Sequence, residues 1–382
     1  MSDATVNATA AAAAEASDSV AAGAPLISLD HVTVEFGRGK NRFRAVDDVS
    51  LTINKGSIYG IIGFSGAGKS TLVRTMNVLQ RPTSGTVTFN GTTISTLGEG
   101  RLLPLRRKIA MIFQHFNLMP SRTVLDNVTL PLIHEKVSRK DARAKAMHLL
   151  ELVGIADKAK AYPRQLSGGQ QQRTALARIL AYEPAALLLD EPFSALDSFL
   201  KWNLEMELTE VLDSFAGPAI WVSHDRGEAF RNCRWVCVMD QGKTLPAQAM
   251  DELFFSPGTE AAARLTGCKN YARAIPNGNT VTLREWGIAL RCAEKAGSMV
   301  QCVGIRAHSV RPATLGEENA FSCTVERIIQ DVFSTIILLR PVGATQEAPL
   351  LWMEMDKNNG QKIHNSRTLT VAVAPQQIML LH

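Results

Sequence analysis

The chain has 382 residues, 46% of them hydrophobic and 20% charged, which is typical of a globular protein with two or three domains. Its formal charge of +5 is a mild excess without a dense Lys/Arg tract, which argues against a nucleic-acid partner. No apolar run approaches the ~20 residues of a membrane-spanning helix. The six cysteines form no CxxC pair typical of a zinc site, so we expect a soluble, cytoplasmic protein with reduced thiols.

The order of strand-like and helix-like stretches predicts two domains behind an N-terminal tail. Residues 1–25 are rich in alanine and have neither a basic start nor an apolar block, which favours a disordered tail over a signal peptide. Over 26–257 the two periodicities alternate, which predicts an α/β domain with a largely parallel sheet. The expected strands are 27–36, 46–53, 57–62, 87–89, 109–113, 185–189 and 219–222; the expected helices are 70–79, 139–153, 169–181 and 200–215. Over 258–382, strand-like runs at 300–305, 321–329, 335–339, 350–355 and 369–373 predict a small all-β domain.

A glycine-rich motif of the form GxxxxGK[ST] stands between the strand 57–62 and the helix 70–79. Such a loop aims backbone N–H groups at phosphate oxygens, and the following helix adds its positive N-terminal end. We expect Lys69 to reach the β- and γ-phosphates of ATP and Ser70 to ligate Mg²⁺. The nucleotide-binding residues predicted here are Gly63, Ser65, Gly66, Ala67, Gly68, Lys69, Ser70 and Thr71.

Two carboxylates end the apolar strand 185–189 and complete such a site. Asp190 is the expected partner of Mg²⁺, through water, because this ion keeps part of its hydration shell. Glu191 is then free to act as general base on the attacking water. An ordinary acidic turn is the alternative, and the glycine-rich loop argues against it.

The sequence Leu-Ser-Gly-Gly-Gln at 166–170 separates this chain from other nucleotide enzymes, because it resembles the signature of ABC ATPases. Its serine and glycines open a helix whose N–H groups can hold a γ-phosphate. In that family the signature faces the glycine loop of a second cassette, so that two cassettes enclose two ATP molecules. The resemblance implies that Ser167, Gly168, Gly169 and Gln170 act on the nucleotide of a partner copy.

Further family elements follow in the expected order. Gln114 matches the glutamine that contacts Mg²⁺ and the attacking water, and Asp197 lies in a match to the loop that crosses the dimer interface. His224 matches the histidine that contacts the γ-phosphate. Phe36 is the candidate for stacking on adenine, with Phe43 as a rival.

The resemblance implies a P-loop α/β cassette with a helical subdomain, followed by a small all-β accessory domain, and an ATP-hydrolysing importer subunit with ATP and Mg²⁺ as cofactors. Its expected partners are permease subunits on separate chains, an external solute-binding protein indirectly, and a second copy of itself. The expected location is the cytoplasmic face of the membrane. An exporter or a soluble non-transport cassette is the alternative; the chain has no long coiled coil and only one cassette, which favours the importer.

The cargo signals are mixed. Residues 111–118 look most like methionine-importer ATPases, whereas 191–197 and the β domain, including 303–308, look like the molybdate/sulfate type. We expect an oxyanion, with methionine as the alternative. Lys269 or Arg306 could hold a regulatory oxyanion in the β domain, and a passive domain that braces the dimer is the alternative.

The segment 115–132 mixes turn formers with apolar residues that look exposed, namely Phe116, Leu118, Met119 and Leu125. One interpretation is a surface that receives a helix of the permease. The other is that these side chains fill the helical subdomain.

Overall fold

The computed structural model describes residues 24–113, 116–133, 137–194, 198–213, 215–360, 363 and 367–382. The chain divides into two compact units, Met1–Met250 and Asp251–His382, so the division falls before the boundary expected after Pro257. Most of the predicted tail lies outside the described residues, and Pro25 already belongs to a strand. None of the helices in the described part of the chain is long and apolar enough to cross a membrane.

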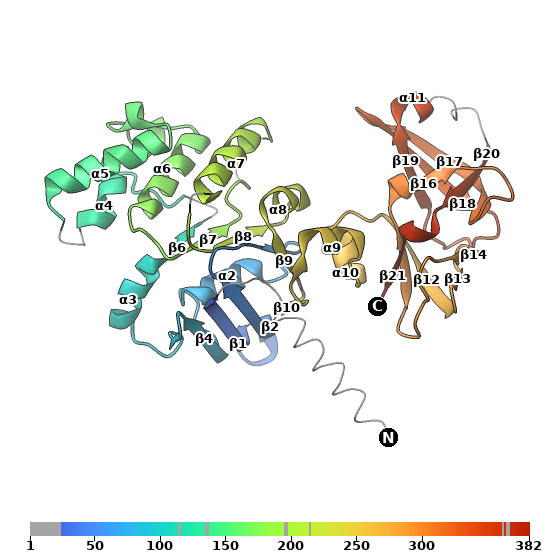
Figure 1. The fold of residues 1–382 in the computed structure, drawn as a ribbon, viewed down its shortest axis with the longest axis horizontal. Coiled ribbons are helices and arrows are strands. Elements are labelled where there is room, and N and C mark those ends of the chain that lie inside the picture. The colour runs from blue at the N-terminus through green and yellow to red at the C-terminus, as the bar shows by residue number, and fades with distance from the viewer. Residues whose placement is uncertain are drawn as a thin grey trace, which may run out of the picture. The chain divides into compact units, whose positions relative to one another are not determined.

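The first unit contains an antiparallel sheet in the order β2-β1-β4-β5 (Figure 1). Buried and exposed residues alternate along most of β2, since one face of the sheet packs on the core, whereas β1 also buries consecutive residues, as at Val32, Thr33 and Val34. The strands are β1 (Pro25–Phe36), β2 (Phe43–Asn54), β4 (Ser84–Phe89) and β5 (Thr92–Thr93).

A second sheet, in the order β10-β9-β3-β8-β7-β6, forms the centre of the first unit. Strands β9, β3, β8, β7 and β6 run parallel, and every residue of β7 and β8 is buried, as expected for a sheet covered on both faces. Because parallel strands end at the same edge of the sheet, the segments that follow these strands lie close together there. The strands are β3 (Ile58–Ile62), β6 (Ile109–Ile112), β7 (Ala186–Asp190), β8 (Ala219–Ser223), β9 (Trp235–Asp240), β10 (Lys243–Thr244) and β11 (Gln248–Ala249), the last paired with β9.

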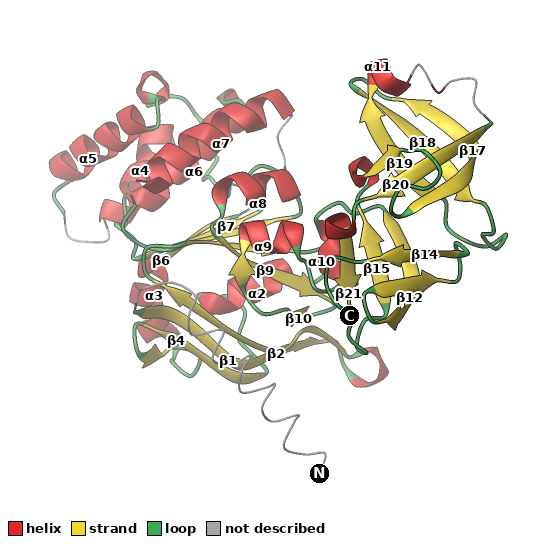
Figure 2. Cartoon of the chain, turned by 45° about the vertical axis from the view of Figure 1, so that its right-hand side comes forward, coloured by secondary structure: helices red, strands yellow, loops and turns green. Residues whose placement is uncertain are grey.

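Helix α2 lies against the strands of the central sheet, and α4, α5 and α6 pack on one another as a helical subdomain (Figures 1 and 2). One hydrophobic core joins both sheets and α2, with Leu72, Ile61 and Val222 among its buried members. The helices are α2 (Lys69–Met76), α3 (Glu99–Lys108), α4 (Val124–Ile133), α5 (Arg139–Leu152), α6 (Gly168–Leu180), α7 (Ser198–Asp213) and α8 (Arg226–Asn232). Leu125 is buried in α4, contrary to the expectation of exposure, whereas Met119 is exposed.

The second unit consists of two five-stranded sheets, ordered β14-β13-β12-β15-β21 and β16-β20-β17-β18-β19, with every pair antiparallel. This confirms the all-β prediction. Its strands are β12 (Asn270–Asn277), β13 (Thr280–Leu283), β14 (Ile288–Arg291), β15 (Cys302–Ile305), β16 (Val310–Pro312), β17 (Ala320–Gln330), β18 (Ser334–Pro341), β19 (Leu351–Asp356), β20 (Thr368–Val373) and β21 (Ile378–Leu381); its short helices are α9 (Met250–Phe255), α10 (Glu260–Leu265) and α11 (Lys357–Gly360). Its core surrounds Trp286, Ile337 and Leu351, all fully buried.

Candidate functional site

The glycine-rich loop joins β3 to α2 and requires glycine at several positions. Gly66 and Gly68 have φ values of 81° and 105°, in the left-handed region that L side chains rarely adopt. A Cβ at Gly63 would lie 2.2 Å from the carbonyl oxygen of Met239, and one at Gly68 would lie 2.0 Å from that of Ala45. The loop therefore holds its shape only with these glycines.

Lys69 opens α2 and bends back over the loop, with 4% of the residue exposed. Its Nζ donates to the carbonyl oxygens of Gly63 at 2.8 Å and Phe64 at 2.9 Å, and lies 4.0 Å from Oε1 of Glu191. Burial lowers the pKa of Lys69, and the nearby carboxylates of Glu191 and Asp190 offset this only in part. The loop thus holds a buried amine whose hydrogen bonds can be exchanged for those of an anion.

Asp190 ends β7 with 1% of the residue exposed and meets two side chains of α2. Its Oδ1 accepts a hydrogen bond from Oγ of Ser70 at 2.7 Å, and its Oδ2 lies 3.5 Å from Arg74. Burial raises the pKa of Asp190, while Ser70 and Arg74 act in the opposite direction. The buried carboxylate is therefore paired with one hydroxyl and one guanidinium, both from α2.

These donors fit Mg²⁺ in chemical type. A hydroxyl and a carboxylate are hard oxygen ligands, and Mg²⁺ binds through few protein oxygens while keeping several waters. Among the residues that the structure describes, no group of three or more His, Cys, Asp or Glu could hold a metal ion. Ser70 and Asp190 would supply the protein oxygens.

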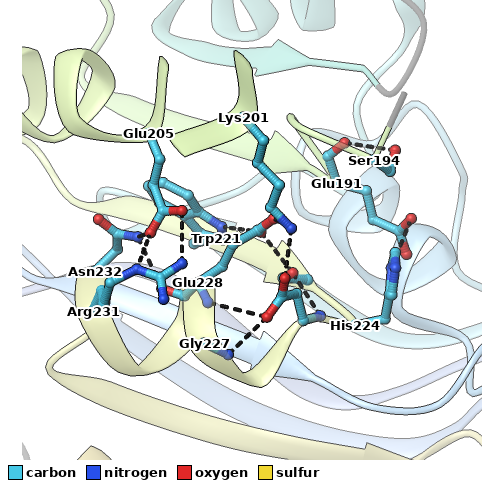
Figure 3. Close-up of polar contacts among 12 residues, drawn as sticks. Glu191, Ser194, Lys201, Glu205, Trp221, His224, Gly227, Glu228, Arg231 and Asn232 are labelled. Carbon is cyan, nitrogen blue, oxygen red and sulfur yellow. Dashed lines mark hydrogen bonds and ion pairs between the residues drawn. The ribbon is translucent and has the colours of Figure 1, made fainter. Parts of the chain in front are cut away.

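Glu191 and His224 come from neighbouring strand ends and face each other (Figure 3). The distance from Nδ1 of His224 to Oε2 of Glu191 is 3.2 Å. Glu191 itself has a φ of 49°, and its backbone N–H donates to the carbonyl of Val222 at 3.1 Å, so the chain turns sharply at the end of β7. The turn points the carboxylate toward the glycine loop rather than along the strand.

A cavity of about 400 Å³ opens beside the loop. The aromatic rings of Phe36 and Phe43 border it with centroids 5.8 Å apart, and Phe43 is 59% exposed. Both aromatic candidates thus face the same space. The remaining lining residues are Ala45, Ser65, Gly66, Gly68, Lys69, Ser70, Thr71 and Glu191.

The signature residues lie elsewhere, at the N-terminus of α6. Ser167 caps the helix: its Oγ accepts from the N–H of Gln170 at 3.4 Å, and Oε1 of Gln170 accepts from the N–H of Ser167 at 3.1 Å. Neither these two residues nor Gly168 and Gly169 are among those lining the cavity beside the glycine loop. Within one described chain, the signature and the glycine loop form separate sites.

Two predicted residues, Gln114 and Asp197, lie outside the described residues. The sequence analysis missed Arg74 and Ala45. Arg74 stands four residues after Ser70, so helical periodicity places both on the face of α2 that meets Asp190. Ala45 contributes only its backbone beside Gly68, and side-chain identity gives no signal for such a contact.

Comparison with known proteins agrees with this geometry. The family described as ABC transporter matches residues 46–194. Methionine import ATP-binding protein MetN 1 of Oenococcus oeni is 44% identical over 235 residues, covering 62% of this chain and 67% of that protein. MetN of Lactobacillus johnsonii is 44% identical over 257 residues, covering 66% and 72%.

Solved structures agree as well. A dimeric ATP-binding cassette in a post-hydrolysis state, bound to ADP and Pi, is 33% identical with a TM-score of 0.55, covering 59% of this chain and 99% of that one. The cbiO1 cassette of Clostridium perfringens, part of the cbiONQ transporter complex, is 26% identical with the same TM-score and covers 60% and 90%. These matches confirm the predicted P-loop cassette fold. The chain belongs to the family of ABC transporter ATPases of the importer type.

Proposed function

We propose that this chain hydrolyses ATP to drive solute uptake through permease subunits on separate chains, at the cytoplasmic face of the membrane. One observation carries the proposal: Lys69, the adjacent pair Asp190 and Glu191, and His224, from three segments, converge beside a glycine loop at one edge of a parallel sheet. Ligands of open α/β sheets bind at the carboxyl ends of the strands, which is this edge.

The glycine loop and α2 hold the triphosphate in this proposal. Lys69 exchanges its bonds to the loop carbonyls for phosphate oxygens, and the N–H groups of the loop bind the remaining charge. Ser70 and Asp190 hold Mg²⁺, which when bound neutralises charge on the transferred phosphate. Phe36 or Phe43 stacks on the base.

Glu191 is the proposed general base. It accepts a proton from water as the water oxygen bonds to the γ-phosphorus and the bond to the ADP oxygen breaks. His224 contacts Glu191 directly and so orients its carboxylate toward the glycine loop. Gln114 is proposed to join this group, as in the family motif that it matches.

A second copy is proposed to complete each site. Ser167 and the following glycines stand at a helix N-terminus away from the cavity, where they are available to another subunit's nucleotide. The solved relative with ADP and Pi is described as dimeric, which supports this assembly. Asp197 is proposed to lie at the same interface.

Assembly can be tested by measuring the size of the Glu191→Gln protein with and without ATP and Mg²⁺. Binding that bridges two subunits stabilises the dimer, so ATP should shift monomer to dimer. Adding Ser167→Arg should abolish the shift while leaving nucleotide binding by the loop intact. A protein that stays monomeric while hydrolysis is independent of its concentration would contradict the two-subunit site.

Methionine or a similar amino acid is the proposed cargo, because the relatives named above are methionine importers. This reverses our preference for an oxyanion. Arg306, one of the cations considered for an oxyanion, donates instead to backbone carbonyls of Thr266 and Phe254, and Lys269 lies 5.8 Å from the centre of the Trp352 ring. An oxyanion remains the second candidate because the second unit is all-β, as expected for that type.

Uptake of labelled methionine and labelled molybdate by cells lacking this chain separates the two cargoes. We expect wild-type protein to restore methionine uptake and Glu191→Gln to fail. Restoration of molybdate uptake alone would reverse the assignment of cargo without changing that of the motor.

A further inference from the structure

A polar network links α7 to the turn that carries His224 (Figure 3). Lys201, one turn into α7, reaches across to two carboxylates of the β8–α8 segment. Its Nζ lies 2.5 Å from Oδ2 of Asp225 and 2.6 Å from Oε1 of Glu228. The Glu228 side chain is 3% exposed and that of Asp225 is 37% exposed, so the contact of Lys201 with Glu228 is the buried one.

Both chain neighbours of His224 are tied to this lysine. Ser223, which precedes it, donates from Oγ to Oε2 of Glu228 at 2.7 Å. Asp225, which follows it, accepts from Lys201 and also caps α8, with its Oδ1 accepting from the N–H of Gly227 at 2.8 Å. The N–H of Asp225 donates to Oγ of Ser223 at 2.9 Å, which closes the turn on itself.

The charges in this network favour a fixed arrangement. Burial disfavours the ammonium of Lys201, but its hydrogen bonds to Asp225 and Glu228 outweigh burial and raise its pKa. Burial likewise acts against the ionised form of Asp225, yet Lys201 and two backbone N–H groups lower its pKa. One ammonium thus faces two carboxylates, and its removal leaves two like charges side by side.

The histidine ring is held less tightly than its backbone. His224 has a side chain that is 56% exposed and lies 3.2 Å from Glu191. Its position relative to Glu191 is therefore set mainly by the backbone of the turn. A displacement of 1 Å between catalytic groups can lower a rate about 10²-fold, so fixing this turn has a kinetic consequence.

We propose that Lys201 is a positioning residue for ATP hydrolysis, which holds His224 against Glu191 through Ser223, Asp225 and Glu228. The inference rests on the proposed function, since it assigns a support to the proposed role of His224. It also makes α7 the element that holds the His224 turn in place.

The same two helices carry a matched ion pair that does not touch the turn. Arg231 of α8 donates from Nε and NH2 to Glu205 of α7, at 2.7 and 2.8 Å, and its guanidinium lies 4.9 Å from the centre of the Trp202 ring. Glu205 is 2% exposed, so this pair is also buried. Arg231→Met therefore measures the cost of losing an α7–α8 ion pair while leaving in place the hydrogen bonds that Ser223 and Asp225 make.

The test compares kcat, KM for ATP and melting temperature for Lys201→Met, Lys201→Arg and Arg231→Met. We expect Lys201→Met to lower kcat about tenfold with KM within twofold of wild type, and Lys201→Arg to restore most of the loss because it keeps the cation. Arg231→Met should lower the melting temperature comparably while kcat stays within twofold. Ser223→Ala, a small change that removes the link to Glu228, should also lower kcat.

Equal losses of kcat in Lys201→Met and Arg231→Met would mean that both residues act only by stabilising the fold. That result would overturn the proposal. If Lys201→Met does not fold, unchanged kcat in Ser223→Ala overturns it instead. His224→Ala distinguishes the role proposed for His224 from the role proposed for Lys201. Absence of ATP turnover in the wild-type protein would refute the proposed function, and wild-type turnover in His224→Ala would refute the role proposed for His224. Loss of turnover in His224→Ala beside normal Lys201→Met turnover would refute the positioning role alone.

Discussion

The two units of this protein bury polar side chains of different kinds. Among the described residues, the buried charged groups of the first unit are Lys69, Asp190, Glu205 and Glu228. The buried polar residues of the second unit are all uncharged: Thr266, Asn270, Ser309 and Thr335. Burying an ion costs several kcal/mol unless partners compensate it, and the buried carboxylates of the first unit have such partners, namely Ser70 and Arg74 for Asp190, Arg231 for Glu205 and Lys201 for Glu228. Charge burial therefore distinguishes the first unit from the second.

Sheet type explains where the charges gather. In the first unit β3, β7 and β8 are parallel and adjacent, so their carboxyl ends meet at one edge and deliver the glycine loop, the two carboxylates and His224 together. In the second unit every strand pair is antiparallel, so successive strands end at opposite edges. The predictions below test whether this difference has consequences for turnover and stability.

The largest effect is expected at Glu191. Exchange to Gln should lower ATP turnover roughly 10²–10⁴-fold, the usual contribution of a positioned general base, while ATP binding is retained. Steady-state ATPase assays beside nucleotide titrations measure both quantities. Glu183→Gln, on an exposed carboxylate of the same unit, is the control and should leave turnover unchanged. Near-normal turnover in the Glu191 variant would mean that another group is the base.

Substitutions in the core of the second unit should lower its stability and leave ATP turnover unchanged. Trp286→Ala removes a fully buried ring and its hydrogen bond to the carbonyl of Pro349, and should cost about 3–5 kcal/mol of unfolding free energy in that unit. Thermal unfolding should show an earlier transition, with ATP turnover within twofold of wild type. Val342→Ala, at an exposed position, should change stability by less than about 0.5 kcal/mol. A parallel loss of turnover would show that the second unit supports catalysis directly.

Lys69 should affect binding more than turnover at saturation. Lys69→Met removes a buried ammonium expected to donate to phosphate, and charged hydrogen bonds contribute roughly 1.5–3 kcal/mol, so ATP affinity should fall about 10–100-fold. Isothermal titration with ATP and Mg²⁺ measures it. Lys55→Met, on an exposed lysine of the same unit, provides the control. Unchanged affinity would contradict the assignment of the glycine loop.

A surface charge of the second unit should give the smallest effect. The backbone N–H of Thr314, Arg311 and the Thr314 hydroxyl together lower the pKa of Glu317 to about 2. Because the folded pKa lies below the unfolded one, its stabilisation is fully present above the unfolded pKa and is lost as pH falls toward 2. Glu317→Gln should lower the melting temperature of this unit near neutral pH, with the difference vanishing near pH 2. Glu318→Gln is the neighbouring control, and a difference that persists at low pH would contradict the prediction.

The sequence predicted the helices and strands that have a clear hydrophobic periodicity. It missed those that contain residues unfavourable for the element they form. Helices α5 and α6 begin and end within one residue or so of the predicted bounds. Helix α2 stops at Met76, before the predicted end, where Asn77 leaves helical geometry and Val78 takes a φ of 55°. Helices α3 and α4 were not predicted. Each contains a proline, and proline is unfavourable inside a helix, so helix propensity favours a loop at both places. The hairpin of β12 and β13 was missed although its two-residue loop, Gly278-Asn279, is a turn signal.

The candidate site divides along a similar line. Lys69, Ser70, Asp190, Glu191 and His224 belong to motifs with fixed spacing, and the structure places them together. The lysine of α7 and the buried Glu228 belong to no motif, because their partnership depends on how α7 packs on α8 rather than on distance along the chain. Sequence reasoning thus predicts the groups proposed to touch the ligand and misses the side chains that hold those groups in place.

The left-handed backbone of Glu191 determines which substitutions this position tolerates without strain. At a φ of 49°, residues branched at Cβ are disfavoured, whereas asparagine and glycine are tolerated. Exchange to either would remove the carboxylate without adding backbone strain, so selection for folding offers no resistance to its loss. Substitution of this residue is therefore opposed only by selection for ATP turnover. A descendant of this chain released from transport would therefore lose its proposed general base early while keeping its fold.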